Sequence, residues 1–418
     1  MSVRPKLFRD PVHDIISFRP ESPEGRVLLG LIESPEIQRL RRIRQLGLTN
    51  FVYHGAEHSR FVHSMGVSVL AGRMYDQVRP NGDVGERLAV VAAALCHDLG
   101  HGPFSHVAER IGSFHHEDVT RAIITRHDTQ VHQVLSSYDR ALPGRVSALY
   151  GARNSDKCLR QLVSSQLDAD RIDYILRDGL ATGVKIGVFD VERILSTLEI
   201  HEGWICASFR AVEAVEGYLL ARFHMYKQVY LHKTSRSAER MLEAAFRRAR
   251  ELRATGKGPD WECRGPFAHL VDGCIDGPRD IPLLDDMDVW FALKQWAGDT
   301  DPILAELAGG LVHRRLFKTR AIPMGAEGDA LLRSAWECAG RLGLHPDYHV
   351  LEDSSEDTPY SPYIPGKSTP DEAIRILCAD GRVVPIEAVS DIVRLLGQVR
   401  YQVRRLIAPA AVMAKLGS

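Results

Sequence analysis

Three histidines and an aspartate fall within the ten residues from His97 to His106. His97 and Asp98 are adjacent and close the apolar run 88–95, which is typical of the end of a buried helix. Because a buried imidazole or carboxylate needs a partner, a metal ion or an anion would have to hold these side chains together. Nitrogen and oxygen ligands of this kind suit Mn, Fe, Mg, Zn or Ni. The stretch therefore predicts a divalent metal site, with a solvated polar turn as the alternative.

His63 is a further candidate ligand. On a helix expected over residues 59–78, it shares one face with Val67, Leu70 and Met74. That face is apolar, so we expect His63 to be buried. A lone buried histidine is more often a hydrogen-bonded core residue than a ligand. His63 becomes a candidate because the predicted metal site needs more than two ligands.

A polar stripe marks a third segment. In a helix expected over residues 156–178, the side chains of Asp170, Tyr174, Arg177 and Asp178 share one face. This stripe is compatible with a salt-bridged surface or with one wall of a polar cleft. Basic residues and tyrosines alternate again in a helix expected over residues 211–250, a pattern that suits contacts with phosphates and bases.

Composition excludes several classes of function. The 418 residues include 53 basic and 54 acidic side chains, so no overall field would attract nucleic acid. No apolar run approaches the ~18 residues that a membrane-spanning helix needs. The first residues lack a signal core, and seven cysteines without a Cys-x-x-Cys motif fit a reducing compartment. We therefore expect a cytoplasmic protein without membrane segments and without nucleic acid as its main partner.

The pattern along the chain predicts two parts. Residues 1–300 are expected to form a helical catalytic core, with the site between about residues 50 and 240. From about residue 310, short β-like runs replace the helical pattern, before a final helix expected over residues 386–406. Residues 301–418 are therefore expected to form a small α+β C-terminal lobe.

The order His63, His97-Asp98, Asp170 resembles the ligand order of the HD superfamily of metal-dependent phosphohydrolases. Several longer strings make the resemblance narrower, including Asp-Pro-Val-His at 10–13 and His-Asp-Leu-Gly-His-Gly-Pro-Phe-Ser-His at 97–106. They are similar to strings in deoxynucleoside triphosphate triphosphohydrolases, or dNTPases. The most similar members would be the bacterial relatives of the vertebrate enzyme that carries a sterile-alpha-motif domain.

This resemblance implies a mainly α fold with an HD-domain helical core. It implies a metal-dependent hydrolase that splits dNTPs into deoxynucleoside and inorganic triphosphate, by attack of water at the α-phosphate. The divalent metal would be bound by His63, His97, Asp98 and Asp170. His101 and His116 match histidines beside the α-phosphate, with Glu117 expected to orient His116. The other matches are expected to bind the substrate: Gln45, Leu46, Arg60, His106, Arg171, Tyr174, Asp178, Arg222, Tyr230 and Lys233.

The resemblance also concerns regulation and assembly. Glu33, Gln38 and Arg41 match part of a regulatory nucleotide site at a subunit interface in relatives, with Glu33 in place of a guanine-reading aspartate. We therefore expect a homo-oligomer, a dimer or a tetramer, and leave open whether a nucleotide activates it. Glu109 stands where the vertebrate enzyme has an aspartate near the catalytic histidine.

Two rival functions stay open at this point. One is an HD-type phosphodiesterase or nucleotidase that acts on a cyclic nucleotide, a monophosphate or an alarmone. It would keep the metal ligands but have no use for the full set of basic phosphate contacts. The other is a nucleotide sensor without turnover, against which the presence of both His101 and His116 argues.

Overall fold

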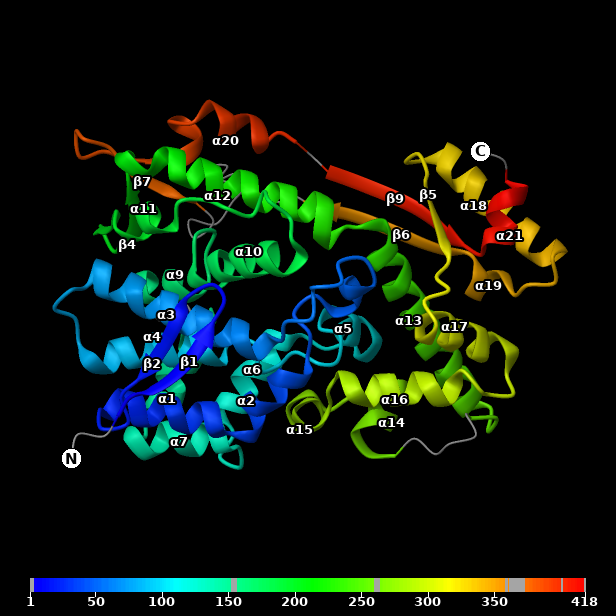
Figure 1. The fold of residues 1–418 in the computed structure, drawn as a ribbon, viewed down its shortest axis with the longest axis horizontal. Coiled ribbons are helices and arrows are strands. Elements are labelled where there is room, and N and C mark those ends of the chain that lie inside the picture. The colour runs from blue at the N-terminus through cyan, green and yellow to red at the C-terminus, as the bar shows by residue number, and fades with distance from the viewer. Residues whose placement is uncertain are drawn as a thin grey trace.

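Figure 1 shows the computed structural model, which describes residues 4–151, 156–258, 264–357, 360, 373–399 and 401–416. The described chain is mainly helical and contains three small sheets, which confirms the predicted fold class. No helix in these ranges is both long enough and apolar enough to cross a membrane.

Three packed helices form the centre of the large helical body. α3 (Arg60–Val78) packs against α4 (Val84–Cys96) and against α10 (Ala169–Thr182). The small side chains along 88–96 are all buried, so α4 can lie close to α3. The side chain of Asp168 accepts a hydrogen bond from the backbone N–H of Arg171 and so caps the start of α10. Gly183 ends this helix in the left-handed conformation, with φ 74°.

The arginine-rich segment 37–46 does not form one continuous helix. Helix α1 (Pro23–Glu33) is followed by α2 (Pro35–Arg39), a 3₁₀ turn over Leu40–Arg42 and another over Gly47–Phe51. Arg39 is buried and donates hydrogen bonds to three backbone carbonyls that belong to distant loops. The buried guanidinium of Arg39 holds the chain at the point where α2 ends, and the sequence pattern does not reveal these long-range contacts.

Two long helices predicted from the sequence are each interrupted. The segment 156–178 forms α9 (Lys157–Val163) and α10, because Asp156 caps the first helix and Asp168 caps the second. The segment 211–250 forms α12 (Val212–Met225), a π-helical turn over Tyr226–Tyr230, and α13 (Lys233–Ala254), which His232 caps. Each break brings polar side chains to the end of a helix, where the site is built.

The other helices surround this centre or form the second half of the molecule. They are α5 (His106–Gly112), α6 (His116–Thr125), α7 (Gln130–Tyr138), α8 (Leu142–Ala148), α11 (Val191–Leu195), α14 (Gly265–Asp272), α15 (Gly277–Asp280), α16 (Asp286–Trp296), α17 (Pro302–Val312), α18 (Ala326–Arg341), α19 (Pro346–His349), α20 (Asp391–Leu396) and α21 (Ala410–Lys415). One large hydrophobic core joins α1, α3, α4, α10 and α12, and a second core surrounds α13.

The three sheets are small. β1 (Lys6–Asp10) and β2 (Asp14–Phe18) form an antiparallel hairpin. A second sheet has the order β3 (Leu198–His201), β4 (Trp204–Ser208), β7 (Arg375–Leu377) and β8 (Val383–Pro385), with β4 and β7 parallel. The third has the order β5 (Lys318–Ala321), β9 (Tyr401–Ala408) and β6 (Leu351–Asp357). In Figure 1 the β6–β9 ribbon extends away from α12 toward α18 and α21.

The final helix predicted over residues 386–406 is wrong. α20 covers only six residues in the first half of this range, and β9, the central strand of the third sheet, covers its end. Arg405 on this strand pairs with the buried carboxylate of Asp353, a contact that requires the extended chain. The expected division of the chain at residue 300 stays a prediction.

Candidate active site

Three helices deliver the predicted metal ligands. His63 lies in the first turn of α3, His97 and Asp98 follow the last turn of α4, and Asp170 lies in the first turn of α10. The Nε2 atoms of His63 and His97 are 3.2 Å apart. Asp170 Oδ1 is 3.0 Å from the first nitrogen and 3.5 Å from the second. Asp98 Oδ1 is 3.2 Å from His97 Nε2, so all four residues converge on one point.

The contacts behind the two histidines determine which ring nitrogen carries the proton. His97 Nδ1 donates to the carbonyl of Ala94 at 2.7 Å, and His63 Nδ1 donates to Asp173 Oδ2 at 2.8 Å. When both rings are neutral, each Nε2 atom therefore presents a lone pair toward the other and toward Asp170. Acceptors that face one another in this way are stabilised by a cation between them. The donor set of two nitrogens and carboxylate oxygens fits a divalent metal.

The electrostatics of the site agree with this donor set. Burial lowers the pKa of His63, but hydrogen bonds to Asp170 and Asp173 outweigh burial and raise the pKa to about 10. Burial also opposes ionisation of Asp98, yet the guanidinium of Arg60, 2.6 Å away, holds the pKa of this carboxyl well below its usual range. The carboxylates therefore stay ionised and attract a proton to His63, which a bound metal ion would replace.

A second group of histidines surrounds Glu109. His116 Nδ1 donates to Glu109 Oε2 at 3.0 Å, and His106 Nδ1 donates to Glu109 Oε1 at 2.6 Å. The rings of His101 and His116 stack, with centroids 3.9 Å apart and planes at 15°. Burial opposes ionisation of Glu109, but the two histidine hydrogen bonds lower the pKa of its carboxyl far below the usual range.

The orienting contact to His116 therefore comes from Glu109, and the expectation that Glu117 provides it is wrong. Glu109 lies in the first turn of α5 and also accepts a hydrogen bond from the backbone N–H of His116. Glu117 is exposed in the first turn of α6, where its charge favours the helix N-terminus. A sequence reading favours the neighbour in the chain, whereas the packing of α5 against this turn selects Glu109.

One cavity of about 620 Å³ joins both histidine groups to a basic and aromatic wall. Nearly all of the predicted catalytic and substrate-binding residues line it: Gln45, Leu46, Arg60, His63, His97, Asp98, His101, His106, His116, Glu117, Asp170, Arg171, Tyr174, Asp178, Arg222 and Tyr230. Polar lining residues that the sequence did not single out include Tyr150, Arg110, Arg236 and Glu239. Tyr226, which belongs to the alternation of tyrosines and basic residues after Arg222, lines the cavity as well.

The basic side chains of this wall are held in place by second partners. Arg60 Nε donates to the hydroxyl of Ser105 at 2.8 Å, in addition to its contact with Asp98. Arg171 pairs with the carboxylate of Asp168 at 2.6 Å. Arg222 Nη1 donates to Gln166 Oε1 at 2.7 Å. Fixed guanidinium groups lose little conformational entropy when they bind an anion.

At the other end of the cavity, Asp178 accepts two hydrogen bonds. His58 Nε2 donates to its Oδ1 at 2.7 Å, and the hydroxyl of Tyr230 donates to its Oδ2 at 2.8 Å. The ring of Tyr174 packs edge-on against Tyr230, with centroids 6.1 Å apart. His58 was not predicted as a site residue, although it lies close in the sequence to Arg60 and His63. This end of the cavity is therefore a rigid, partly aromatic wall.

Some predicted site residues lie elsewhere. Lys233 is exposed at the start of α13 and does not line the cavity. Glu33, Gln38 and Arg41 lie on and just after α1 and α2, also outside it. Arg41 Nε donates to Gln38 Oε1 at 2.8 Å, while Glu33 pairs with Lys6 at 2.9 Å. These three residues form a surface group apart from the cavity, and a nucleotide-binding role for them stays a prediction.

Known proteins match both the sequence and the fold. The HD domain model matches residues 60–176, and the HD associated region model matches residues 189–257. An uncharacterized protein of Bacillus subtilis, YwfO, is 38% identical over 97% of this chain and 92% of its own length. The crystal structure of a phosphohydrolase from Bacteroides thetaiotaomicron is 31% identical and superposes with a TM-score of 0.78, covering 97% of this chain and all of that one.

More distant relatives carry a named activity. A Dictyostelium discoideum homologue of the deoxynucleoside triphosphate triphosphohydrolase SAMHD1 is 33% identical, over 57% of this chain and 49% of its own length. The chain thus spans about half of this relative. With the ligand order on three packed helices and full-length relatives above 30% identity, the chain belongs to the HD-domain phosphohydrolases that carry an HD-associated region.

Proposed function

We propose that the protein hydrolyses deoxynucleoside triphosphates at the α-phosphorus and releases deoxynucleoside and inorganic triphosphate. The observation that carries this proposal is the composition of one cavity. It joins the predicted metal ligands, a carboxylate-held histidine pair and several fixed guanidinium groups within about 620 Å³. A volume of this size lies in the range of sites for small molecules and cofactors, ~300–1,000 Å³. The similarity to SAMHD1 homologues supports the same reaction.

Binding of the triphosphate would use a buried donor that has no partner in the described part of the chain. Arg222 Nε is buried and finds no hydrogen-bond partner there. Arg222 lines the cavity. A buried donor without a partner costs roughly 1–3 kcal/mol, which an anionic oxygen of the substrate would recover. Arg171 on α10, which lines the same cavity, would add a fixed positive charge.

The chemistry then divides among the chain's own residues. A bound divalent ion would supply Lewis-acid polarisation of a phosphate oxygen and ease the ionisation of water. His116, held by Glu109 through Nδ1, would donate a proton from Nε2 to the leaving 5′-oxygen, and the proton that the attacking water loses would restore it. His101, stacked on His116, would stabilise charge on the α-phosphate. Tyr174 and the Tyr230–Asp178 pair would hold the deoxyribose.

The test is a product analysis with purified protein and Mn²⁺ or Mg²⁺. Each dNTP and each NTP is incubated separately, and the products are resolved by ion-exchange chromatography. The proposal expects deoxynucleoside and triphosphate in equal amounts. Pyrophosphate, single phosphate or no turnover would reject it and would favour a nucleotidase, a phosphodiesterase or a sensor.

A further inference from the structure

The turn between β1 and β2 is linked to the predicted metal site through one carboxylate, that of Asp173. His13 in this turn contacts Asp173 Oδ1 through its Nε2 atom at 2.7 Å. The other oxygen of the same carboxylate accepts the hydrogen bond from His63 Nδ1 at 2.8 Å. The side chains of His13, Asp173 and His63 are 7%, 0% and 1% exposed. A residue in an N-terminal hairpin is therefore separated from a predicted metal ligand by one buried carboxylate.

The turn itself is fixed by a second carboxylate. Asp10 Oδ1 accepts hydrogen bonds from the backbone N–H groups of Val12 and His13, each at 2.9 Å. Asp10 Oδ2 pairs with Arg177 Nη1 at 2.8 Å, and Arg177 Nε donates to Asp173 Oδ2 at 2.8 Å. The hairpin and α10 are thus joined by two routes that meet at Asp173.

Helix α3 leaves room for this network. At Gly66, less than one turn after His63, a Cβ atom would lie 2.0 Å from Asp173 Oδ1 and 2.4 Å from Arg177 Nη2. Both positions are occupied by the network that links the hairpin to His63. Any larger residue at this position would force the carboxylate away from the histidine.

We propose that His13 is a positioning residue for the metal site, which acts through Asp173 to fix the orientation of His63. A histidine that binds a metal through one nitrogen is oriented by the acceptor of its other N–H, here Asp173. That acceptor is buried, so it needs its own partners to stay in place. The inference rests on the metal ligand set alone and does not depend on which nucleotide is hydrolysed.

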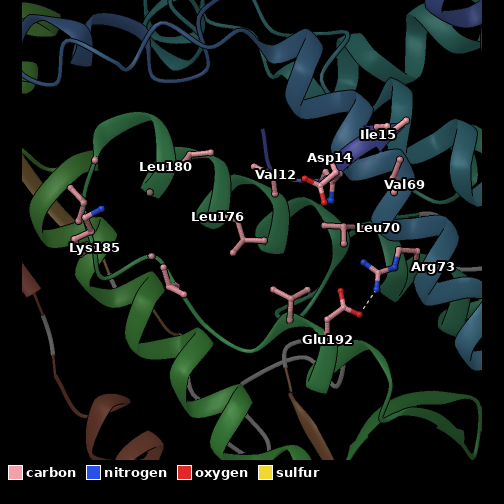
Figure 2. Close-up of a pocket in the computed structure, with 17 residues that line it drawn as sticks. Val12, Asp14, Ile15, Val69, Leu70, Arg73, Leu176, Leu180, Lys185 and Glu192 are labelled. Atoms are coloured by element: carbon pink, nitrogen blue, oxygen red, sulfur yellow. Dashed lines mark hydrogen bonds and ion pairs between the residues drawn. The ribbon is translucent and has the colours of Figure 1, made fainter. Parts of the chain in front are cut away.

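A second cavity gives small molecules access to this contact. It has a volume of about 650 Å³, is lined by residues 12–15, and shares no lining residue with the active-site cavity. Figure 2 shows Val12 and Asp14 of the turn beside Leu70 of α3, with Leu176 and Leu180 of α10 along another wall. Imidazole is small enough to enter such a space and to replace a missing histidine ring.

The first experiment measures metal affinity without nucleotide. Mn²⁺ is titrated into metal-free wild type and His13→Ala by calorimetry, and the d–d absorption of bound Co²⁺ reports ligand geometry. We expect a 10–100-fold loss of affinity, because changes to the outer partners of metal ligands have effects of this size. His54→Ala, which removes an exposed histidine outside both cavities, is the matched control and should bind as the wild type does.

The second experiment tests access through the cavity. Millimolar imidazole should restore most of the affinity of His13→Ala, whereas in the wild type it can only compete for metal. Adding Leu180→Trp, which fills the cavity, should block the rescue and leave the otherwise wild-type protein unchanged. If His13→Ala does not fold, as judged by thermal unfolding, His13→Asn retains a donor and should keep affinity within about tenfold.

Wild-type affinity in a folded His13→Ala protein would overturn the proposal. So would a loss that imidazole does not relieve. Because both readouts omit nucleotide, they stay informative even if the protein fails to hydrolyse dNTPs.

Discussion

Replacing Glu109 by glutamine isolates the contact that the structure assigns to catalysis. The carboxylate accepts one hydrogen bond from the ring of His116 and one from the ring of His106, and its side chain is only 12% exposed. Glutamine has nearly the same shape but only one acceptor oxygen, and it has no charge. One of the two histidines must then face an amide N–H₂ group instead of an oxygen. His116 loses the nearby negative charge in either orientation of the amide, and it also loses its orienting hydrogen bond where the N–H₂ group faces it.

The size of the effect follows from the kind of hydrogen bond that is lost. A hydrogen bond to a charged group contributes ~1.5–3 kcal/mol, compared with ~0.5–1.5 kcal/mol between neutral groups. Because the carboxylate of Glu109 is largely buried, solvent screens little of the energy of the charged hydrogen bond. A loss of about 1.4–2.7 kcal/mol in the transition state corresponds to a 10–100-fold decrease in kcat. KM should change by less than about threefold, because Glu109 acts through His116 and is not expected to contact the bound substrate.

The assay is steady-state hydrolysis of the best dNTP substrate, with metal content measured on the same samples. Glu117→Gln removes a neighbouring exposed carboxylate that does not contact His116, and it should reduce kcat by less than threefold. A larger loss of kcat in Glu117→Gln than in Glu109→Gln would refute the assignment. A loss of bound metal in Glu109→Gln would show that the effect is not on His116.

Three further outcomes are expected. Asp98→Ala should lose bound metal, measured by mass spectrometry of the protein-bound ions, together with activity; metal content equal to that of the wild type would contradict the ligand set. The wild type should prefer dGTP over GTP by about tenfold or more in kcat/KM, because the 2′-hydroxyl of GTP would be buried without a partner. Leu46→Ala should reduce this preference, and equal hydrolysis of both nucleotides by the wild type would disprove this account of the pocket. Burial raises the pKa of Asp353, but the contacts with Arg236 and Arg405 outweigh burial and lower this pKa below its usual value. The ion pairs therefore stabilise the fold above about pH 4, and their contribution is lost as the pH falls. Asp353→Asn should therefore be roughly 3–5 kcal/mol less stable at pH 7 and show a weaker acid dependence of Tm, measured by thermal unfolding between pH 3 and 7.

Much of the site could be predicted because its chemistry is concentrated in short strings. His97 and Asp98 are adjacent, and His101 follows within one turn, so local spacing alone indicates a shared function. The apolar face of α3 indicates that His63 is buried. These features can be read from the sequence alone, because the period of a helix determines which side chains share a face. The mainly α fold follows from the same periodicity.

The interruptions of the helices were not predictable in the same way. A run such as 211–250 keeps a helical pattern across Leu231, where the backbone leaves the helix and His232 caps the next one. The predicted final helix fails for a related reason, since β9 is selected by pairing with β5 and β6. Strand pairing is a long-range contact, and the local pattern of apolar residues does not contain it.

By itself, the sequence determined the residue types, the ligand order and the faces on which they lie, since these depend only on chain-local geometry. Only the tertiary structure decided which carboxylate serves which histidine. Glu109 rather than Glu117 holds His116, and Asp173 links His63 to a hairpin that lies far away in the chain. Hydrogen bonds act over about 3 Å, and which groups come that close depends on how the helices pack.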